Sequence, residues 1–114
     1  MFRVIVVGGN STNDFEFFRT KCVNILRNKA NEGIMIYTTG DEFVRKFAQM
    51  YRIDLKIFTA EFKKDGKNAL SVRNNKMLED CDAVICFDNG TREIKYIHDM
   101  ACERHIPARL IHYN

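Results

Sequence analysis

Short apolar runs alternate with amphipathic stretches along the whole chain. Each apolar run is followed by turn residues and is too short for a helix, which predicts buried strands. The runs span 2–7, 34–37, 55–58, 83–87 and 108–112. Between them, apolar positions recur at the spacing of one helix face over about 14–26, 41–51, 67–78 and 91–104. This alternation predicts an α/β fold.

The order of these elements also predicts the topology. Strands joined by helices favour a parallel sheet with helices on both faces, because crossovers between parallel strands are right-handed. We expect a three-layer Rossmann-like fold, with a five-stranded parallel sheet in the order 3-2-1-4-5, in one domain over residues 1–114. In that order the first and fourth strands are neighbours, and ligands bind above their carboxyl ends, where the winding reverses.

Three local features refine this prediction. Asn13 or Asp14 can cap the first helix, since both side chains accept hydrogen bonds from free N–H groups. In the second helix the inward stripe runs from Phe43 to Tyr51. The polar segment 59–66 is longer than a usual connection, so we expect a loop that reaches over a neighbouring surface.

Composition limits the class of protein. With 114 residues, of which 46% are hydrophobic and 29% charged, the chain has enough core for one soluble domain. Lys and Arg exceed Asp and Glu by 18 − 15 = 3, an excess too small to indicate nucleic acid binding. No apolar run approaches the roughly 20 residues that cross a bilayer. We therefore expect a cytoplasmic protein without a membrane partner, whose ligand carries a modest negative charge.

The four cysteines are scattered, without a Cys-x-x-Cys pair: Cys22, Cys81, Cys86 and Cys102. Cys22 and Cys86 fall among apolar positions, which favours a role as core residues over a metal site or a disulfide. We expect free thiols, no metal and no cofactor. His98, His105 and His112 lie on or after the last helix and strand, which favours packing or solvent exposure over catalysis.

Two loops should face each other above the first and fourth strands. Gly8-Gly9-Asn10 follows the first strand, and Asp88-Asn89-Gly90-Thr91 follows the fourth. Glycine lets the backbone approach a ligand, although a glycine pair can also serve only as a turn. The chain lacks Gly-x-Gly-x-x-Gly, the Walker lysine pattern and an acid at the end of the second strand in the position that would bind a ribose in a dinucleotide fold. These absences argue against a dinucleotide fold of the NAD type.

Arg73 and Glu93 are the charged residues that flank the fourth strand. Arginine suits phosphate recognition through its rigid donor fork, and Met77, one turn later, can pack inward and so fix the direction of Arg73. The alternative for Arg73 is a solvated helical charge. Glu93, in the first turn of the last helix, can simply favour the helix dipole.

These residues together resemble a known family. The Gly-Gly strand end, the Thr39-Gly40-Asp41 loop, the Arg73-Asn74-x-x-Met77 helix and the Gly90-Thr91 turn are similar to the SLOG superfamily of small Rossmann-like nucleotide-binding domains. The closer similarity is to its short YspA-like branch and covers nearly the whole chain. The resemblance implies a nucleotide-like ligand, a homodimer, and a binding site built from Gly8, Gly9, Asn10, Thr39, Gly40, Arg73, Asn74, Asp88, Asn89, Gly90 and Thr91.

The chain also departs from the family pattern. In the related Lonely Guy enzymes, Arg-Lys-x-x-Met and Gly-Gly-x-Gly-Thr-x-x-Glu serve phosphoribohydrolase chemistry. Here Asp88-Asn89 replaces the glycine pair, and Glu93 stands one residue early, which turns a helical side chain by about 100°. The displacement argues against Glu93 as a catalytic residue. The loop Thr38–Glu42 is also shorter than its YspA-like counterpart.

Three functions stay open at this point. The first is a binding module that senses or sequesters a nucleotide or a derivative such as an ADP-ribose compound, and a mobile element could use such a module. The second is a phosphoribohydrolase in which Arg73 holds the phosphate and Glu93 or Asp88 steers a water molecule. The third is a structural or partner-binding domain with a vestigial pocket.

Overall fold

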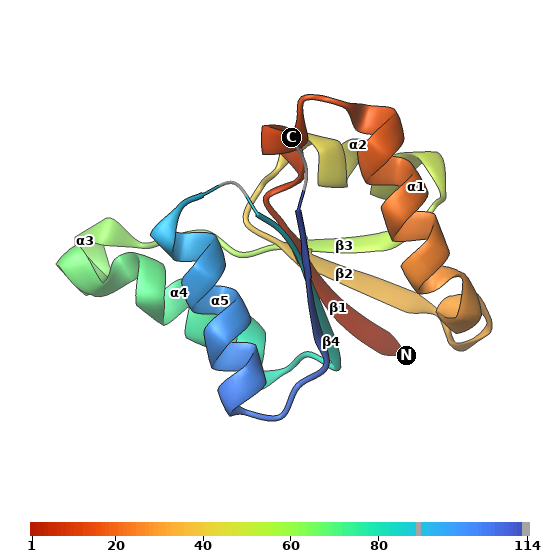
Figure 1. Ribbon diagram of the computed structural model, residues 1–114. Coiled ribbons are helices and arrows are strands. Elements are labelled where there is room, and N and C mark those ends of the chain that lie inside the picture. Colours follow the sequence, from red (N-terminus) through yellow and green to blue (C-terminus); the bar gives the residue numbers. More distant parts are fainter. Residues whose placement is uncertain (89, 113–114) are drawn as a thin grey trace.

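The computed structural model describes residues 1–88 and 90–112, which form three layers (Figure 1). Over these residues, a five-stranded, wholly parallel sheet has the order β3-β2-β1-β4-β5. The strands are β1 (Phe2–Val7), β2 (Ile34–Thr38), β3 (Asp54–Ile57), β4 (Ala83–Phe87) and β5 (Ala108–Ile111). The α/β fold and strand order expected from the sequence are confirmed.

Helices cover both faces of the sheet (Figure 1). α1 (Phe15–Leu26) and α2 (Glu42–Met50) lie on one face, while α4 (Ala69–Glu79) and α5 (Arg92–Glu103) lie on the other. Of the two candidate caps of α1, Asp14 takes the role, since its side chain accepts a hydrogen bond from the Phe17 N–H at 3.2 Å. Short 3₁₀ turns precede and follow α1, at η1 (Gly9–Thr12) and η2 (Arg27–Glu32).

Two expectations are wrong in detail. The segment 59–66 is not a plain loop, because it contains the one-turn helix α3 (Phe62–Asp65) and enters the 3₁₀ turn η3 (Gly66–Asn68). Tyr51 does not extend the inward stripe of α2. The helix ends at Met50, so Tyr51 falls at the cap, where it is 42% exposed.

The core has two halves, one on each face of the sheet, because alternate residues of a strand point in opposite directions. Val4 and Val6 of β1 pack on the α1–α2 side with Cys22. Ile5 and Val7 pack on the α4–α5 side with Cys86. All four cysteines carry free thiols. Burial raises the pKa of Cys86 to about 12 and also raises that of Cys22, so both thiols stay protonated and behave as apolar core groups.

Helix length and hydropathy bear on membrane insertion. Within the described residues, no helix combines the length and the apolar character that crossing a membrane requires.

The ends of β1 and β4 approach each other closely at Gly8. This residue has a φ of +82°, and a Cβ atom added to it would lie 2.3 Å from the Phe87 carbonyl oxygen. Real Cβ atoms do not come this near to a backbone oxygen, so glycine is required both by conformation and by space. The turn after β1 therefore sits directly against the end of β4.

Replacement of Gly8 by alanine tests this contact. We expect Gly8→Ala to lower the free energy of unfolding by about 2 to 4 kcal/mol, because it adds a backbone clash to left-handed strain. The matched control is Gly90→Ala, which has a φ of +77° but no atom within 4 Å of the added Cβ. Urea denaturation measures both. Equal losses in the two variants would show that the clash with Phe87 is unimportant.

A buried hydroxyl links β2 to the end of α4. Tyr37 is 3% exposed, and its hydroxyl donates a hydrogen bond to the Asp80 carboxylate at 2.6 Å. Burial, followed by the hydrogen bond to Asp80 and the charge of that carboxylate, raises the pKa of Tyr37 to about 12 from an ordinary value of 10.0. Because the folded pKa exceeds the unfolded one, this group's contribution to stability is complete below pH 10 and is lost as the pH rises toward 12.

Replacement of Tyr37 by phenylalanine isolates this contribution. We expect Tyr37→Phe to be less stable than the parent by about 1 kcal/mol near neutral pH, because the hydrogen bond to Asp80 is lost. The difference should shrink between pH 10 and pH 12 as the hydroxyl of the parent ionises. Urea denaturation of both proteins across this range provides the measurement. A difference that stays constant to the upper end would contradict the raised pKa.

Candidate functional site

A crevice of about 490 Å³ opens above the carboxyl ends of β1 and β2, beside the first turn of α5. The winding reverses between β1 and β4, where the sequence predicts the ligand site, so the crevice lies beside that point: it shares the end of β1, but its second strand is β2, and the segment after β4 contributes only through the first turn of α5. Five of the residues singled out from the sequence line it: Gly8, Asn10, Thr39, Gly40 and Glu93. Val7, Asp41 and Ile94 complete the lining. The crevice thus gathers three segments that are far apart in the sequence.

Glu93 is held at the crevice by an ion pair with Arg73. Nη2 of Arg73, on α4, contacts Oε1 of Glu93, on α5, and the two side chains are 10% and 36% exposed. Nε of Arg73 donates to the Asn74 side-chain oxygen at 3.2 Å. Arg73 is therefore not a solvated helical charge. It lies behind Glu93 and outside the crevice lining, so it acts on the crevice through that carboxylate.

The neighbours of Arg73 on α4 explain why its direction is fixed. Met77, one turn later, is fully buried and anchors α4 against the sheet, as the sequence predicts. Asn74 is 2% exposed, so it serves as an internal hydrogen-bond partner and lies away from the crevice lining. An arginine that is this well enclosed keeps its geometry, since little rotamer freedom remains. The Glu93 carboxylate is correspondingly positioned before any ligand arrives.

One wall of the crevice is formed by hydrogen bonds that join Asn10 to Asp41, here called the Asn10–Asp41 clasp. The Asn10 N–H donates to Oδ2 of Asp41 at 3.0 Å. The Phe43 N–H donates to Oδ1 of Asn10 at 2.8 Å and to Oδ1 of Asp41 at 3.0 Å. Both side chains therefore cap the N-terminus of α2 and tie the first loop to the second. Asp41 was not among the site residues singled out from the sequence, although its place in Thr39-Gly40-Asp41 before a helix is a capping signal.

Gly9 has a packing role beside the Asn10–Asp41 clasp. A Cβ atom at this position would lie 2.4 Å from a ring carbon of Phe18, which is fully buried on α1. The absence of a side chain lets η1 pack directly on that ring. Gly9 does not line the crevice.

The turn after β4 shapes the start of α5. The Gly90 N–H donates to Oδ1 of Asp88 at 3.0 Å, and the Thr91 side chain accepts a hydrogen bond from the Ile94 N–H at 3.4 Å as the helix cap. Asp88, Gly90 and Thr91 thus lie next to the crevice without lining it. Asn89, the remaining candidate in this turn, falls outside the described residues.

His112 lies beside the turn after β4. Its side chain is 74% exposed, as expected, but its Nδ1 lies 3.1 Å from Oδ2 of Asp88, a contact that the sequence does not predict. The reason is topological, since β5 pairs with β4 and its carboxyl end reaches the same edge. His98 packs along α5, where Nε2 lies 3.8 Å from Sγ of Cys102.

The charged groups that line the crevice are acceptors of hydrogen bonds. Among the described lining residues, the charged groups are the carboxylates of Asp41 and Glu93. Both oxygens of Asp41 accept hydrogen bonds from backbone N–H groups, one from Phe43 and one from Asn10, whereas among the described contacts Arg73 donates to one oxygen of Glu93. This wall suits a ligand that donates hydroxyl groups, such as a sugar. In the described part of the chain, no three His, Cys, Asp or Glu residues gather closely enough to hold a metal ion.

Comparisons with known proteins leave the site to be judged on its geometry. The chain was compared with protein-family models, with curated proteins and with solved structures, and none of the three comparisons found a match.

Proposed function

We propose that the protein binds a nucleotide or a nucleotide-derived ligand, such as an ADP-ribose derivative, in the crevice above β1 and β2. The observation that carries this proposal is the Glu93 carboxylate, fixed by Arg73 at a crevice of about 490 Å³. A carboxylate beside the switch point of a parallel sheet suits the hydroxyl groups of a ribose. The volume is within the range of small-molecule sites.

The charges of the site favour different positions for the phosphate and the ribose of such a ligand. Arg73 balances the charge of Glu93, whereas Asp41 has no such ion pair among the described residues, so a phosphate belongs away from Asp41, at the N-terminus of α5 next to Gly90 and Thr91. Helix N-termini favour anions through their free N–H groups and their dipole. The ribose then faces Glu93. Arg73 would act as a positioning residue for that carboxylate.

The resemblance to the SLOG superfamily supports the same proposal. It implies a nucleotide-like ligand and a homodimer, and it fits a role in sensing or sequestering a signal, in a cell or in a mobile element.

A phosphoribohydrolase is the second candidate, favoured by the Arg73–Glu93 ion pair itself. Glu93 lines the crevice despite its displacement by one residue from the family pattern. A fixed carboxylate next to the ribose could accept a proton from water as the water oxygen bonds to the ribose C1. The bond from C1 to the base nitrogen would break in the same step, and the proton accepted by Glu93 would pass to that nitrogen through solvent, which restores the carboxylate.

The test uses ligand binding and base release by variants at the ion pair. Thermal-shift screening with mononucleotides, dinucleotides, cyclic dinucleotides and ADP-ribose identifies a ligand, because binding to the native state raises the melting temperature. For that ligand, we expect Glu93→Gln and Arg73→Ala each to weaken binding by about 1.5 to 3 kcal/mol in calorimetry. The first variant removes the carboxylate, and the second removes the side chain that fixes it. Glu103→Gln and Arg104→Ala, at the far end of α5, are matched controls.

The outcomes separate the candidate functions. Base release is measured by chromatography. Tight binding without release of free base supports the binding module. Base release that disappears in Glu93→Gln identifies the enzyme. A screen in which no nucleotide raises the melting temperature would overturn both and leave a structural domain with a vestigial pocket.

A further inference from the structure

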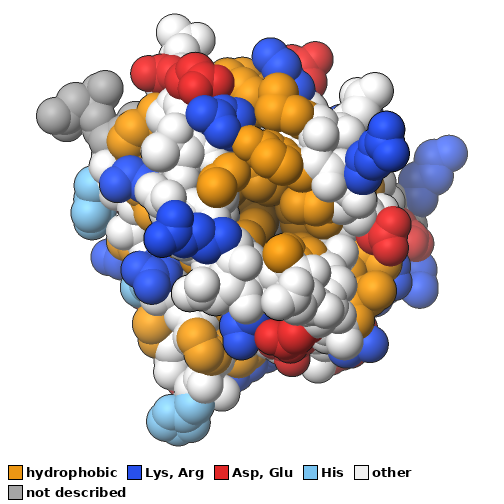
Figure 2. All heavy atoms as spheres, turned by 90° about the vertical axis from the view of Figure 1, so that its right-hand side faces the viewer, with side chains coloured by type: hydrophobic (Ala, Val, Ile, Leu, Met, Phe, Trp, Pro, Cys, Tyr) orange, Lys and Arg blue, Asp and Glu red, His pale blue; other side chains and the backbone are white. Residues whose placement is uncertain are grey.

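A second hollow lies on the face covered by α1 and α2. Figure 2 shows it in the centre of that face, lined by hydrophobic side chains, with Lys and Arg and some Asp and Glu around it. This hollow, here called the α1–α2 groove, has a volume of about 460 Å³. Its apolar lining comes from the ends of both helices and the starts of β2 and β3: Val23, Leu26, Ile34, Phe47, Tyr51 and Ile53. It shares no residue with the crevice, which opens at the opposite ends of the strands.

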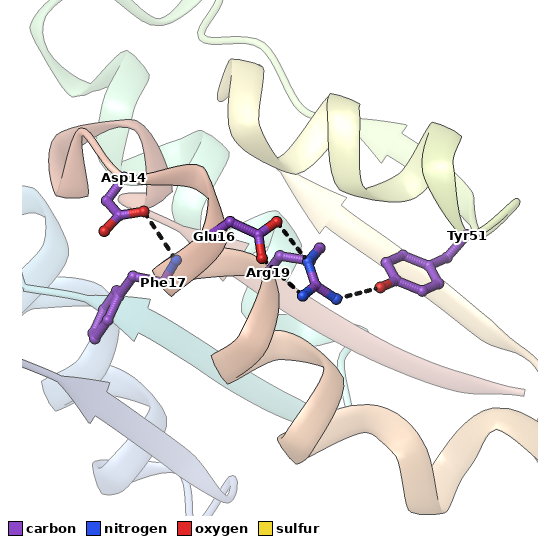
Figure 3. A network of polar contacts seen from close by, with 5 residues as sticks. All are labelled: Asp14, Glu16, Phe17, Arg19 and Tyr51. Atoms are coloured by element: carbon purple, nitrogen blue, oxygen red, sulfur yellow. Dashed lines mark hydrogen bonds and ion pairs between the residues drawn. The ribbon is translucent and has the colours of Figure 1, made fainter.

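The wall of the groove is held in place by a polar network (Figure 3). Nη1 of Arg19 donates to the Tyr51 hydroxyl at 2.8 Å, while Nε and Nη2 of Arg19 each donate to the Glu16 carboxylate at 2.9 Å. This network joins α1 to the end of α2. The Tyr51 ring also packs on Phe47, with the ring centroids 4.9 Å apart. Tyr51 is 42% exposed. The two contacts hold its ring at the wall of the groove and keep the ring from filling the groove.

The charges at the groove favour an anion. Arg27 and Arg52 lie in its lining with one acidic residue, Asp54. Within the described residues, neither guanidinium lies at ion-pair distance from a carboxylate. Two cationic side chains against one carboxylate leave an excess of one positive charge. Arginine presents paired donors that match a carboxylate.

The helix ends beside the groove do not oppose an anion strongly. The last carbonyl groups of a helix normally repel negative charge. Here the Ala48 carbonyl accepts a hydrogen bond from the Ile53 N–H at 2.8 Å, and the Gln49 carbonyl accepts one from the Arg52 N–H at 3.3 Å. These bonds direct the carbonyl oxygens into the turn after α2. α1 continues directly into η2, so its final carbonyls also face backbone donors.

We propose that the α1–α2 groove binds a small amphipathic carboxylate, with the apolar chain in the groove and the carboxylate on Arg27 and Arg52. The volume equals that of about fifteen water molecules, which accommodates a ligand of about a dozen heavy atoms. A medium-chain fatty acid has this size and this distribution of charge. The site is independent of the nucleotide proposed for the crevice.

Calorimetry and methyl NMR with decanoate test the proposal. We expect saturable binding of one decanoate per chain, with shifts of the Val23 and Leu26 methyl signals. Decanol, which has the same chain without the charge, should bind about tenfold more weakly. The double variant Arg27→Gln, Arg52→Asn should bind decanoate about tenfold more weakly than the parent does. Asparagine suits the φ of +54° at position 52, so the backbone there is preserved.

Two filling variants and a charge control complete the design. Val23→Phe should abolish binding by occupying the groove. Ala30→Trp places a large side chain in the same groove from an exposed position. The proposal can therefore still be tested if Val23→Phe misfolds. Lys63→Gln, on α3, removes one charge far from the groove and should leave binding unchanged. Equal affinity for decanol and decanoate, binding that survives Ala30→Trp, or no saturable binding at all would overturn the proposal.

Discussion

The close approach of β1 and β4 is the constraint on which the rest of the structure depends. β1 pairs with β2 on one side and with β4 on the other. Among the described strands, it is therefore the one that both halves of the winding share. At its end, Gly8 lies against the Phe87 carbonyl, a position that no side chain could share. The turn after β1 therefore lies directly against the end of β4, and the crevice opens on its other side, toward the loop after β2.

A second coupling joins the crevice to the far layer of helices. Glu93 starts α5 and Arg73 lies on α4, and their ion pair crosses between these two helices. Since Arg73 is nearly buried, loss of its partner would leave a poorly solvated charge, which proteins rarely tolerate. The same contact that stabilises the α4–α5 layer thereby fixes a carboxylate at the crevice. Stability and the proposed binding depend on one pair of side chains.

Much of the fold could be predicted because it depends on local patterns. β4 spans Ala83–Phe87, the same bounds as its apolar run, and the apolar stripe that follows limits the cap of α1 to Asn13 or Asp14, of which the structure selects Asp14. Tyr51 was misassigned because helical spacing does not say where a helix stops. The short helix α3 was missed because a single turn carries too few residues to show periodicity.

The site was predictable in its backbone and less so in its side chains. Strand ends follow from topology, which is why Gly8, Asn10, Thr39 and Gly40 come together. The direction of Glu93 depends on how α5 is rotated about its axis, and a shift of one residue in sequence does not reveal that rotation. The predicted pairing of β5 with β4 brings His112 beside Asp88, but the contact also depends on the direction of an exposed imidazole, which the sequence does not give.

A double-mutant cycle on Arg73 and Glu93 is the most direct test of the central claim that the two side chains act as one unit. The free energy of unfolding is measured for the parent, Arg73→Met, Glu93→Gln and the double variant. The account predicts that the two single losses exceed the loss in the double variant, with a coupling of about 1 to 3 kcal/mol. Losses that add within about 0.5 kcal/mol would contradict it, because the carboxylate would then be held at the crevice by something else.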